Sequence, residues 1–179
     1  MSFPRIEAEG LVLREWTEDD LAAMQALFDD AEVAYRTPLP SPFDESAARK
    51  YLASAREAHA NGKRLHWAIT TDGQRPLGEI LLNQVTGGIG YIVGAPHRGQ
   101  RLGVRALTAV TQHAHEVAGV RRLILEIEPN NLPSIAVARS AGFHPTDHPL
   151  ETVTDKARTY PLAIWQHTIP PVRTGHARD

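Results

Sequence analysis

The feature that most restricts the fold of this chain is the direct succession of a strand, a glycine-bearing turn and a long helix between residues 89 and 118. Apolar side chains recur every second residue at Ile89, Tyr91 and Val93, which would share one face of the strand. From Gly99 to about Ala118 the apolar spacing becomes helical. The open amides at the start of such a helix favour an anion, although the same pattern fits a plain tight turn between a strand and a helix.

The remaining patterns extend this unit to a mixed α+β domain with one central sheet. A strand over residues 11–16 leads to a helix capped by Thr17, and Asp44 caps a second helix that ends at Asn61-Gly62. Three prolines make residues 36–43 a loop. Further strands are predicted at 65–70, 77–85, 89–94, 123–127, 143–153 and 158–166, and a short helix at 132–141. The predicted order is β-α-α-β-β-β-α-β-α-β-β.

Composition bounds the class of protein. The 179 residues are 42% hydrophobic and 22% charged, with a net charge of −2 and no cysteine. We expect a single domain over residues 1–179, with its core at about 8–168 and a polar tail at 170–179. The sequence contains no run of about 18 apolar residues, which a membrane-spanning helix would need. Its first residues lack the apolar core of a secretory signal, and both observations fit the cytoplasm. The charge argues against a nucleic-acid partner, and the lack of cysteine excludes disulfides and thiolate metal ligands.

The segment from Gly90 to Gly103 reads GYIVGAPHRGQRLG. It resembles the acyl-CoA pyrophosphate loop of GNAT enzymes, whose pattern is Arg/Gln-x-x-Gly-x-Gly/Ala. Arg98 and Gly103 match the first and last positions of that pattern, and Gly99 matches a frequent second one. The middle glycine is replaced by Arg101. A right-handed backbone there would tolerate arginine and let its guanidinium reach a CoA phosphate, whereas a requirement for a bare Cα would weaken or abolish CoA binding.

A second motif lies about 30 residues later and resembles the Asn-x-x-Ser/Ala…Gly-Phe signature of the same family. The matching positions are Asn131, Ser134, Gly142 and Phe143. A well-capped short helix closed by a glycine would show the same residues. The opening strand and acidic helix start, residues 11–20, resemble the RimJ/RimL-like branch of GNAT acetyltransferases. The resemblance runs from about residue 10 to 165, with the motifs in the family's order.

This resemblance implies the GNAT acyl-CoA N-acyltransferase fold, an α+β (mixed α/β) fold with a central, mostly antiparallel sheet of about seven strands and about four helices. It also implies a reaction in which an amine attacks acetyl-CoA directly, without a covalent enzyme intermediate. The pantetheine arm would lie along the 89–94 strand, splayed from the 122–128 strand. The residues implied to bind acetyl-CoA are Ile92, Val93, Arg98, Gly99, Gln100, Arg101, Leu102, Gly103, Asn131 and Ser134.

The leaving thiolate of such a reaction needs a proton or a hydrogen bond. Many GNAT enzymes use a tyrosine in the last helix, but the corresponding residue here is Ala138. RimL-like members place a serine at the start of that helix, which makes Ser134 the candidate unless its hydroxyl bonds its own backbone. Glu151 lies near the position of a catalytic carboxylate in RimL-like proteins. The base itself is left open among Glu79, Glu126, Glu128 and Glu151.

The acceptor implied by the resemblance is a primary amine, on a protein N-terminus or on a small molecule such as an amino acid, a polyamine or an aminoglycoside. We expect the loop at 29–43, together with the second helix, to shape its site, and Tyr35 and Arg36 are the residues whose mutation would test this. A homodimer is compatible with the resemblance. No metal site is expected, because the nine histidines do not follow a ligand spacing. The departures at Arg101 and Ala138 favour an alternative, a non-catalytic CoA-binding or regulatory module with the same fold.

Overall fold

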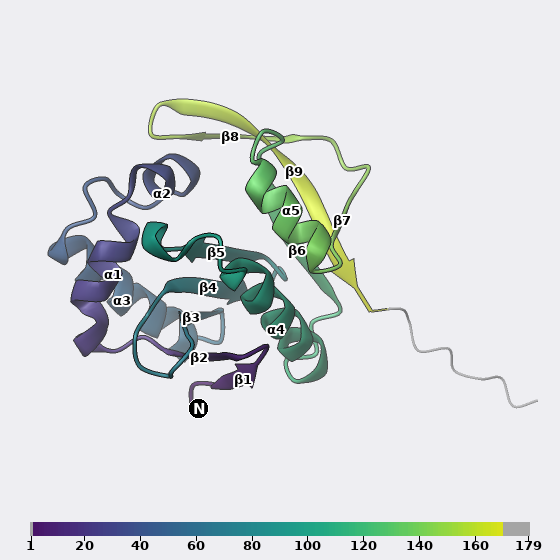
Figure 1. The fold of residues 1–179 in the computed structure, drawn as a ribbon. Coiled ribbons are helices and arrows are strands. Elements are labelled where there is room, and N and C mark those ends of the chain that lie inside the picture. The colour runs from purple at the N-terminus through teal and green to yellow at the C-terminus, as the bar shows by residue number, and fades with distance from the viewer. Residues whose placement is uncertain (1, 170–179) are drawn as a thin grey trace, which may run out of the picture.

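In residues 2–169, the part of the chain that this computed structural model describes, nine strands form two sheets (Figure 1). The first sheet is antiparallel and contains, in order, β1 (Ile6–Ala8), β2 (Leu11–Glu15), β3 (Arg64–Thr70), β4 (Gly78–Asn83) and β5 (Ile89–Val93). The second has the order β6 (Arg122–Ile127), β9 (Arg158–Thr168), β7 (His144–Pro145), and β8 (Glu151–Asp155) also pairs with β9. The polar tail predicted at 170–179 lies outside the described residues.

The structure confirms the mixed α/β class with antiparallel sheets, and it corrects the expectation of one central sheet of about seven strands. The predicted strand at 143–153 is divided into β7 and β8. Pro149 lies in the interruption, where it offers no backbone donor to a ladder. The short strand β1 was not predicted because its three residues are too few to show an alternation.

The two sheets meet at a seam between the start of β5 and the middle of β6. Gly88 and Ile124 form a single parallel bridge, and the Ile124 amide donates to the carbonyl of Gly87 at 2.9 Å. A Cβ at Gly87 would lie 2.2 Å from the carbonyl oxygen of Arg122. Only glycine allows the two backbones to come this close. Beyond this seam β5 and β6 diverge, and within residues 2–169 no further pairing joins them.

Five α-helices occur in the described residues: α1 (Leu21–Phe28), α2 (Ala31–Arg36), α3 (Glu45–Ala60), α4 (Leu102–Glu116) and α5 (Leu132–Ser140). Two 3-10 turns, η1 (Glu18–Asp20) and η2 (Ala95–His97), precede α1 and α4. The prediction of four helices missed α2, because its only buried side chain, Val33, gives no periodic stripe. Asp30 starts α2 by accepting hydrogen bonds from two amides of its first turn, those of Glu32 and Val33. None of the described helices is long and apolar enough to cross a membrane.

The first sheet separates two hydrophobic cores. The core on the α4 side includes Trp67, Ile80 and Leu107, and the core on the side of α1 and α3 includes Trp16, Phe28 and Leu52. Successive residues of a strand face opposite sides, so β5 contributes to both cores. Tyr91 packs against the α4-side core, whereas Ile92 packs against the other. The same alternation places Glu79, which pairs with Ile92 on the next strand, on the side of α1 and α3.

A buried ion pair fixes the passage from β2 to the first helix. Arg14 donates to both carboxylate oxygens of Asp20, at 2.7 and 2.9 Å, and the Thr17 amide donates to the same carboxylate at 2.9 Å. Burial alone would raise the pKa of Asp20, but the hydrogen bonds from Arg14 and Thr17 lower it below its ordinary value. Thr17 is thus the N-cap of the 3-10 turn η1, where it forms a capping box with Asp20, and Asp20 rather than the predicted Thr17 is the N-cap of α1.

Candidate active site

The loop between η2 and α4 presents a series of free amides. We call residues Arg98–Gly103 the 98–103 loop. Within residues 2–169, no backbone amide from Gly99 through Val104 donates to a backbone carbonyl, and the first helical hydrogen bond runs from Arg105 N to Arg101 O at 3.1 Å. The helix thus begins at Leu102 rather than at the predicted Gly99. Free amides at the positive end of a helix form a surface suited to a phosphate or diphosphate.

Arg101 adopts a left-handed backbone conformation, with a φ of 59° and a ψ of 18°. The sequence left open whether this backbone is right-handed, and the structure shows that it is not. This conformation costs a residue with a Cβ roughly 1–2 kcal/mol, which explains why the family pattern has glycine here. The Arg101 side chain is exposed, and within the described residues its guanidinium forms no hydrogen bond or ion pair.

Arg98 is engaged by the protein itself. Its guanidinium donates to Asp30 Oδ1 at 2.9 Å and to the carbonyl of Val93 at 3.2 Å. The pKa of Asp30 would be raised by desolvation, but Arg98 and the amides of α2 lower it below its ordinary value. The side chain of Arg98 therefore ties the 98–103 loop to the start of α2, and its positive charge is paired with the carboxylate of Asp30.

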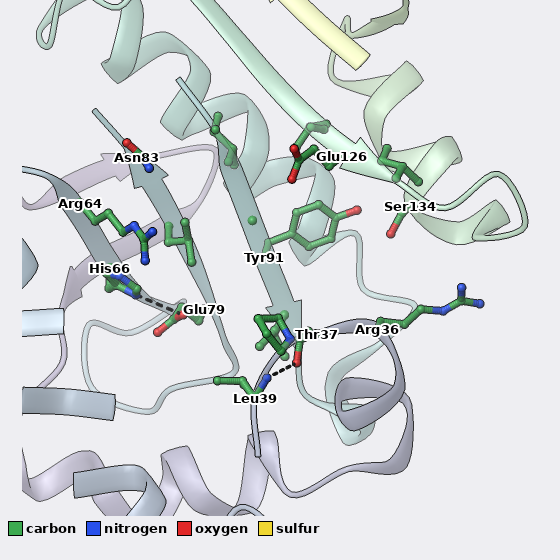
Figure 2. Close-up of a pocket in the computed structure, with 18 of the residues that line it drawn as sticks. Arg36, Thr37, Leu39, Arg64, His66, Glu79, Asn83, Tyr91, Glu126 and Ser134 are labelled. Carbon is green, nitrogen blue, oxygen red and sulfur yellow. Dashed lines mark hydrogen bonds and ion pairs between the residues drawn. The ribbon is translucent and has the colours of Figure 1, made fainter. Parts of the chain in front are cut away.

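A cavity of about 640 Å³ opens where β5 and β6 diverge (Figure 2). Its walls are Gly88–Ile92 of β5 and the preceding turn, Ile124–Ile127 of β6, and side chains from α3, β3, β4 and α5. Of the predicted acetyl-CoA-binding residues, Ile92, Asn131 and Ser134 line it. Val93 and the 98–103 loop are not part of the cavity wall. They come after Ile92, the last residue of β5 that lines the cavity.

The start of α5 has the geometry expected of a capped helix. Asn131 Oδ1 accepts a hydrogen bond from the Ser134 amide at 3.3 Å. The Ser134 side chain faces the cavity and, among the described residues, does not bond its own backbone, which was the alternative reading of the sequence. Ala138, one turn further along the helix, is fully buried in the α4-side core and leaves no room for a tyrosine.

The four candidate glutamates lie in different surroundings. Glu128 is buried and accepts hydrogen bonds from Arg158 at 2.8 and 2.9 Å, and Arg36 lies 3.1 Å from it. The Arg158 hydrogen bonds lower the pKa of Glu128, so this carboxylate is held in an ion-pair network. Glu151 is exposed on β8 and does not line the cavity, whereas Glu126 does. Partial desolvation, together with the nearby Glu151 carboxylate, raises the pKa of Glu126.

Glu79 is the most buried of the four and belongs to a cluster that the sequence did not reveal. Its side chain lines the cavity and is only 1% exposed. The hydroxyl of Tyr51, on α3, donates to Glu79 Oε1 and lies 3.2 Å from Nδ1 of His66, on β3. Glu79 Oε2 has no hydrogen-bond partner in residues 2–169. Burial, followed by the charge of Glu79, raises the pKa of Tyr51 well above its ordinary value, so Tyr51 stays a donor.

The predicted acceptor loop is held against the second sheet. Arg158, at the start of β9, donates to the carbonyl of Tyr35, and its guanidinium lies 3.9 Å from the centre of the Tyr35 ring. Lys156, in the turn between β8 and β9, donates to the carbonyls of Ala34 and Thr37 at 2.8 Å. Arg36 and Thr37 line the cavity. The β8–β9 hairpin thus fixes α2 beside the mouth of the cavity.

Comparison with known proteins identifies the family. A family model described as an acetyltransferase (GNAT) domain matches residues 10–144. A relative in Bacillus subtilis (strain 168), named "Probable N-acetyltransferase YjcK", is 28% identical over 103 residues. That match covers 54% of this chain and 57% of the relative, so the similarity spans little more than half of either protein.

Solved structures show the same fold over nearly the whole chain. RimJ of Mycobacterium smegmatis in complex with CoA-disulfide has a TM-score of 0.79 and 20% identity, with 92% of this chain and 86% of that chain covered. RimL, a ribosomal L7/L12 alpha-N-protein acetyltransferase in complex with coenzyme A, has a TM-score of 0.79 and 19% identity, with 93% and 98% covered. At these identities the likeness shows the fold. Because the family model covers most of the sequence and the fold agrees, the chain belongs to the GNAT acetyltransferase family.

Proposed function

We propose that this chain is an acetyl-CoA-dependent N-acetyltransferase that acts on a primary amine by direct attack. The observation that carries the proposal is the cavity where β5 and β6 diverge. Along it the edge of β5 is free to pair with an extended ligand, and the free amides of the 98–103 loop follow shortly after β5. An acyl-CoA has the matching parts, an extended arm with amide groups and a diphosphate.

The proposed donor site uses both of these surfaces. The amides of the pantetheine arm would pair with the edge of β5 near Ile92 and Val93, and a β5 amide would polarise the thioester carbonyl. The diphosphate would lie on the amides of the 98–103 loop, with the Arg101 guanidinium as a further cation. Arg98 would contribute through its backbone, since its side chain is paired with Asp30.

Glu79 is the carboxylate that we propose receives the proton of the amine. It pairs directly with Ile92, so it lies on the next strand beside the part of β5 proposed to hold the thioester. Glu79 lines the cavity, and its buried Oε2, which has no partner in residues 2–169, would accept a hydrogen bond from the N–H of an incoming neutral amine. The nitrogen lone pair would then attack the acetyl carbon while the proton moves to Glu79.

Glu126 is the second carboxylate in the cavity wall and the alternative proton acceptor. Its raised pKa brings it closer to the working range of a base. Glu151, for which the RimL-like resemblance implies a catalytic role, would act through Glu126, because its charge contributes to that rise in pKa. Ser134 would donate a hydrogen bond to the departing sulfur from the opposite wall.

The acceptor class that we propose includes small primary amines and protein N-termini. The name of the RimL structure, an alpha-N-protein acetyltransferase, supports the inclusion of N-terminal peptides. Arg36, which lines the cavity, and Tyr35, held by Arg158, would contact the part of the acceptor outside the cavity. A change of the acceptor KM in variants of both residues is expected, with the acetyl-CoA KM unchanged.

The proposal is tested by isothermal titration with acetyl-CoA, followed by measurement of CoA release with a panel of amines and N-terminal peptides. We expect saturable binding and amine-dependent CoA release. Binding without release by any amine would support the non-catalytic module that Arg101 and Ala138 suggest. Absence of acetyl-CoA binding in the wild type would overturn the proposed cofactor, and recovery of binding in Arg101→Gly would show that Arg101 obstructs the site.

A further inference from the structure

Tyr91 has a buried hydroxyl without a hydrogen-bond partner in residues 2–169. Burying a polar group without a partner costs stability, so a group of this kind in a cavity wall indicates a ligand that completes its hydrogen bonding. Two of the residues that carry such a group line the cavity between β5 and β6, namely Tyr91 and Glu79. Glu79 faces the proposed amine, whereas Tyr91 lies on the other face of the sheet.

The Tyr91 ring packs against the α4-side core, next to the first turn of α4. A Cβ at Gly103, in the first turn of α4, would lie 3.4 Å from Tyr91 Cε2 and 3.6 Å from Val137 Cγ2 on α5. The Tyr91 ring therefore lies within van der Waals reach of the first turn of α4. Figure 2 shows the Tyr91 hydroxyl directed toward Ser134.

Tyr91 and Glu79 lie on opposite sides of the proposed thioester. Tyr91 faces α4 and α5, whereas Ile92 and its cross-strand partner Glu79 face α1 and α3. In acyl transfer the amine loses a proton while the thiol gains one, so the two proton-transferring groups need separate positions around the reacting carbon. The strand alternation of β5 supplies this separation.

We propose that Tyr91 is the proton donor to the departing CoA sulfur, in place of the helix tyrosine whose position is occupied by Ala138. This assignment rests on the proposed function. As the C–S bond breaks, its electron pair goes to sulfur, and the proton of Tyr91 Oη moves to the same sulfur. The acceptor nitrogen loses one proton to Glu79, and return of that proton to the tyrosinate restores both groups, so the net products are an amide and free CoA.

The electrostatic environment keeps Tyr91 in its donor form. Burial raises the pKa of Tyr91, and the neighbouring Ser134 hydroxyl opposes this rise in part, although the two hydroxyls do not reach hydrogen-bond geometry. The hydroxyl therefore carries its proton at neutral pH and is available when the thiolate leaves.

The first test compares Tyr91→Phe with the wild type, using the amine that the wild type acetylates. We expect kcat to fall by roughly ten- to a hundredfold, which is the lower end of the range for loss of a general acid, with the acetyl-CoA Kd unchanged. Tyr160→Phe is the matched control, because this substitution also removes a tyrosine hydroxyl. Tyr160 lies on β9 and is not part of the cavity wall. Its kcat should equal that of the wild type.

A second measurement needs no amine acceptor. A hydroxyl that donates to sulfur stabilises the thiolate form of bound CoA, so the pKa of the CoA thiol should be lower on the wild type than on Tyr91→Phe. The ultraviolet absorbance of the thiolate, followed against pH with CoA bound, measures this difference. Replacement of Tyr91 by a fluorinated tyrosine, whose phenol is more acidic, should also move the alkaline fall of kcat to lower pH.

The outcomes separate this assignment from the proposed function. If the wild type turns over an amine while Tyr91→Phe keeps full kcat and an unchanged thiol pKa, the Tyr91 assignment is overturned and the N-acetyltransferase function stands. If Tyr91→Phe loses kcat but the thiol pKa and the alkaline limb do not change, Tyr91 has only a packing role. Failure of the wild type to bind acetyl-CoA removes both proposals.

Discussion

Asp30 and Arg98 form an ion pair, with Asp30 Oδ1 2.9 Å from Arg98 Nη2, and this contact joins the cap of α2 to the 98–103 loop. The carboxylate lies beside the proposed diphosphate site, where it opposes an anion. We expect Asp30→Asn to bind acetyl-CoA about two- to fivefold more tightly at low ionic strength, with a smaller gain at high salt. Asparagine also caps helices well, so α2 should be retained. Equal Kd values at both salt concentrations, measured by titration calorimetry, would contradict this electrostatic reading.

Arg101 combines an unfavourable backbone conformation with a cation at the proposed diphosphate site. Two variants separate these effects, because Arg101→Gly removes both and Arg101→Gln removes only the charge. We expect the glycine variant to be up to about 1 kcal/mol more stable than the glutamine variant in urea unfolding. Both should bind acetyl-CoA more weakly than the wild type, by an amount that decreases with salt. Tighter binding by the glycine variant would show that the arginine obstructs the site.

Glu79 and Glu126 are the two cavity carboxylates, and matched glutamine variants distinguish them. We expect Glu79→Gln to lower kcat at least about a hundredfold with the acetyl-CoA Kd retained, because the amine loses its proton acceptor. Glu126→Gln should have a smaller effect. Steady-state kinetics with one amine measures both, and the opposite order would transfer the role of base to Glu126.

Glu151→Gln tests the electrostatic coupling between the carboxylates of Glu151 and Glu126. Desolvation and the Glu151 charge both raise the pKa of Glu126, so removing that charge should lower it. A carbon-detected NMR titration of the glutamate carboxyl groups measures the change. Because the two carboxylates repel each other only when ionised, the variant should gain stability at neutral pH and not at acidic pH. An unchanged Glu126 titration would mean that desolvation alone sets its pKa.

Asp20→Asn should destabilise the fold, since it leaves the buried guanidinium of Arg14 without its counterion. The expected loss is about 2–4 kcal/mol in the free energy of unfolding at neutral pH. Asp20 has a lowered pKa in the folded state, so its contribution is present above the unfolded pKa of an aspartate and is lost as pH falls through the folded value. Denaturant unfolding at neutral and acidic pH should therefore show a smaller difference between variant and wild type at acidic pH.

Local signals in the sequence were sufficient for most of the fold. The change from strand to helix spacing around Gly94–Gly103 located β5 and α4, and the caps at Asp44 and Asn131 located α3 and α5. Each of these signals lies within a few residues of the element that it starts. The helix α2 was missed because one buried residue, Val33, makes no pattern.

The candidate site was less predictable because its groups come from distant parts of the chain. Tyr51, His66 and Glu79 lie on α3, β3 and β4, and only the packing of the helix on the sheet brings them together. The left-handed backbone at Arg101 could not be predicted from the sequence either, since arginine rarely adopts this conformation. The role of Tyr91 depends on which side of β5 each partner occupies, and this follows from strand register, which single-sequence patterns leave unspecified.

The glycine at the seam limits how the proposed site changes its width. At Gly87 the two sheets already touch through their backbones, with no side chain between them to compress or withdraw. We therefore expect any change in the separation of the two sheets to be a rotation about this backbone contact rather than a sliding apart. Such a rotation leaves the Gly88 end of the opening nearly fixed and moves the far end, beside Ile92 and Ile127, through the longest arc.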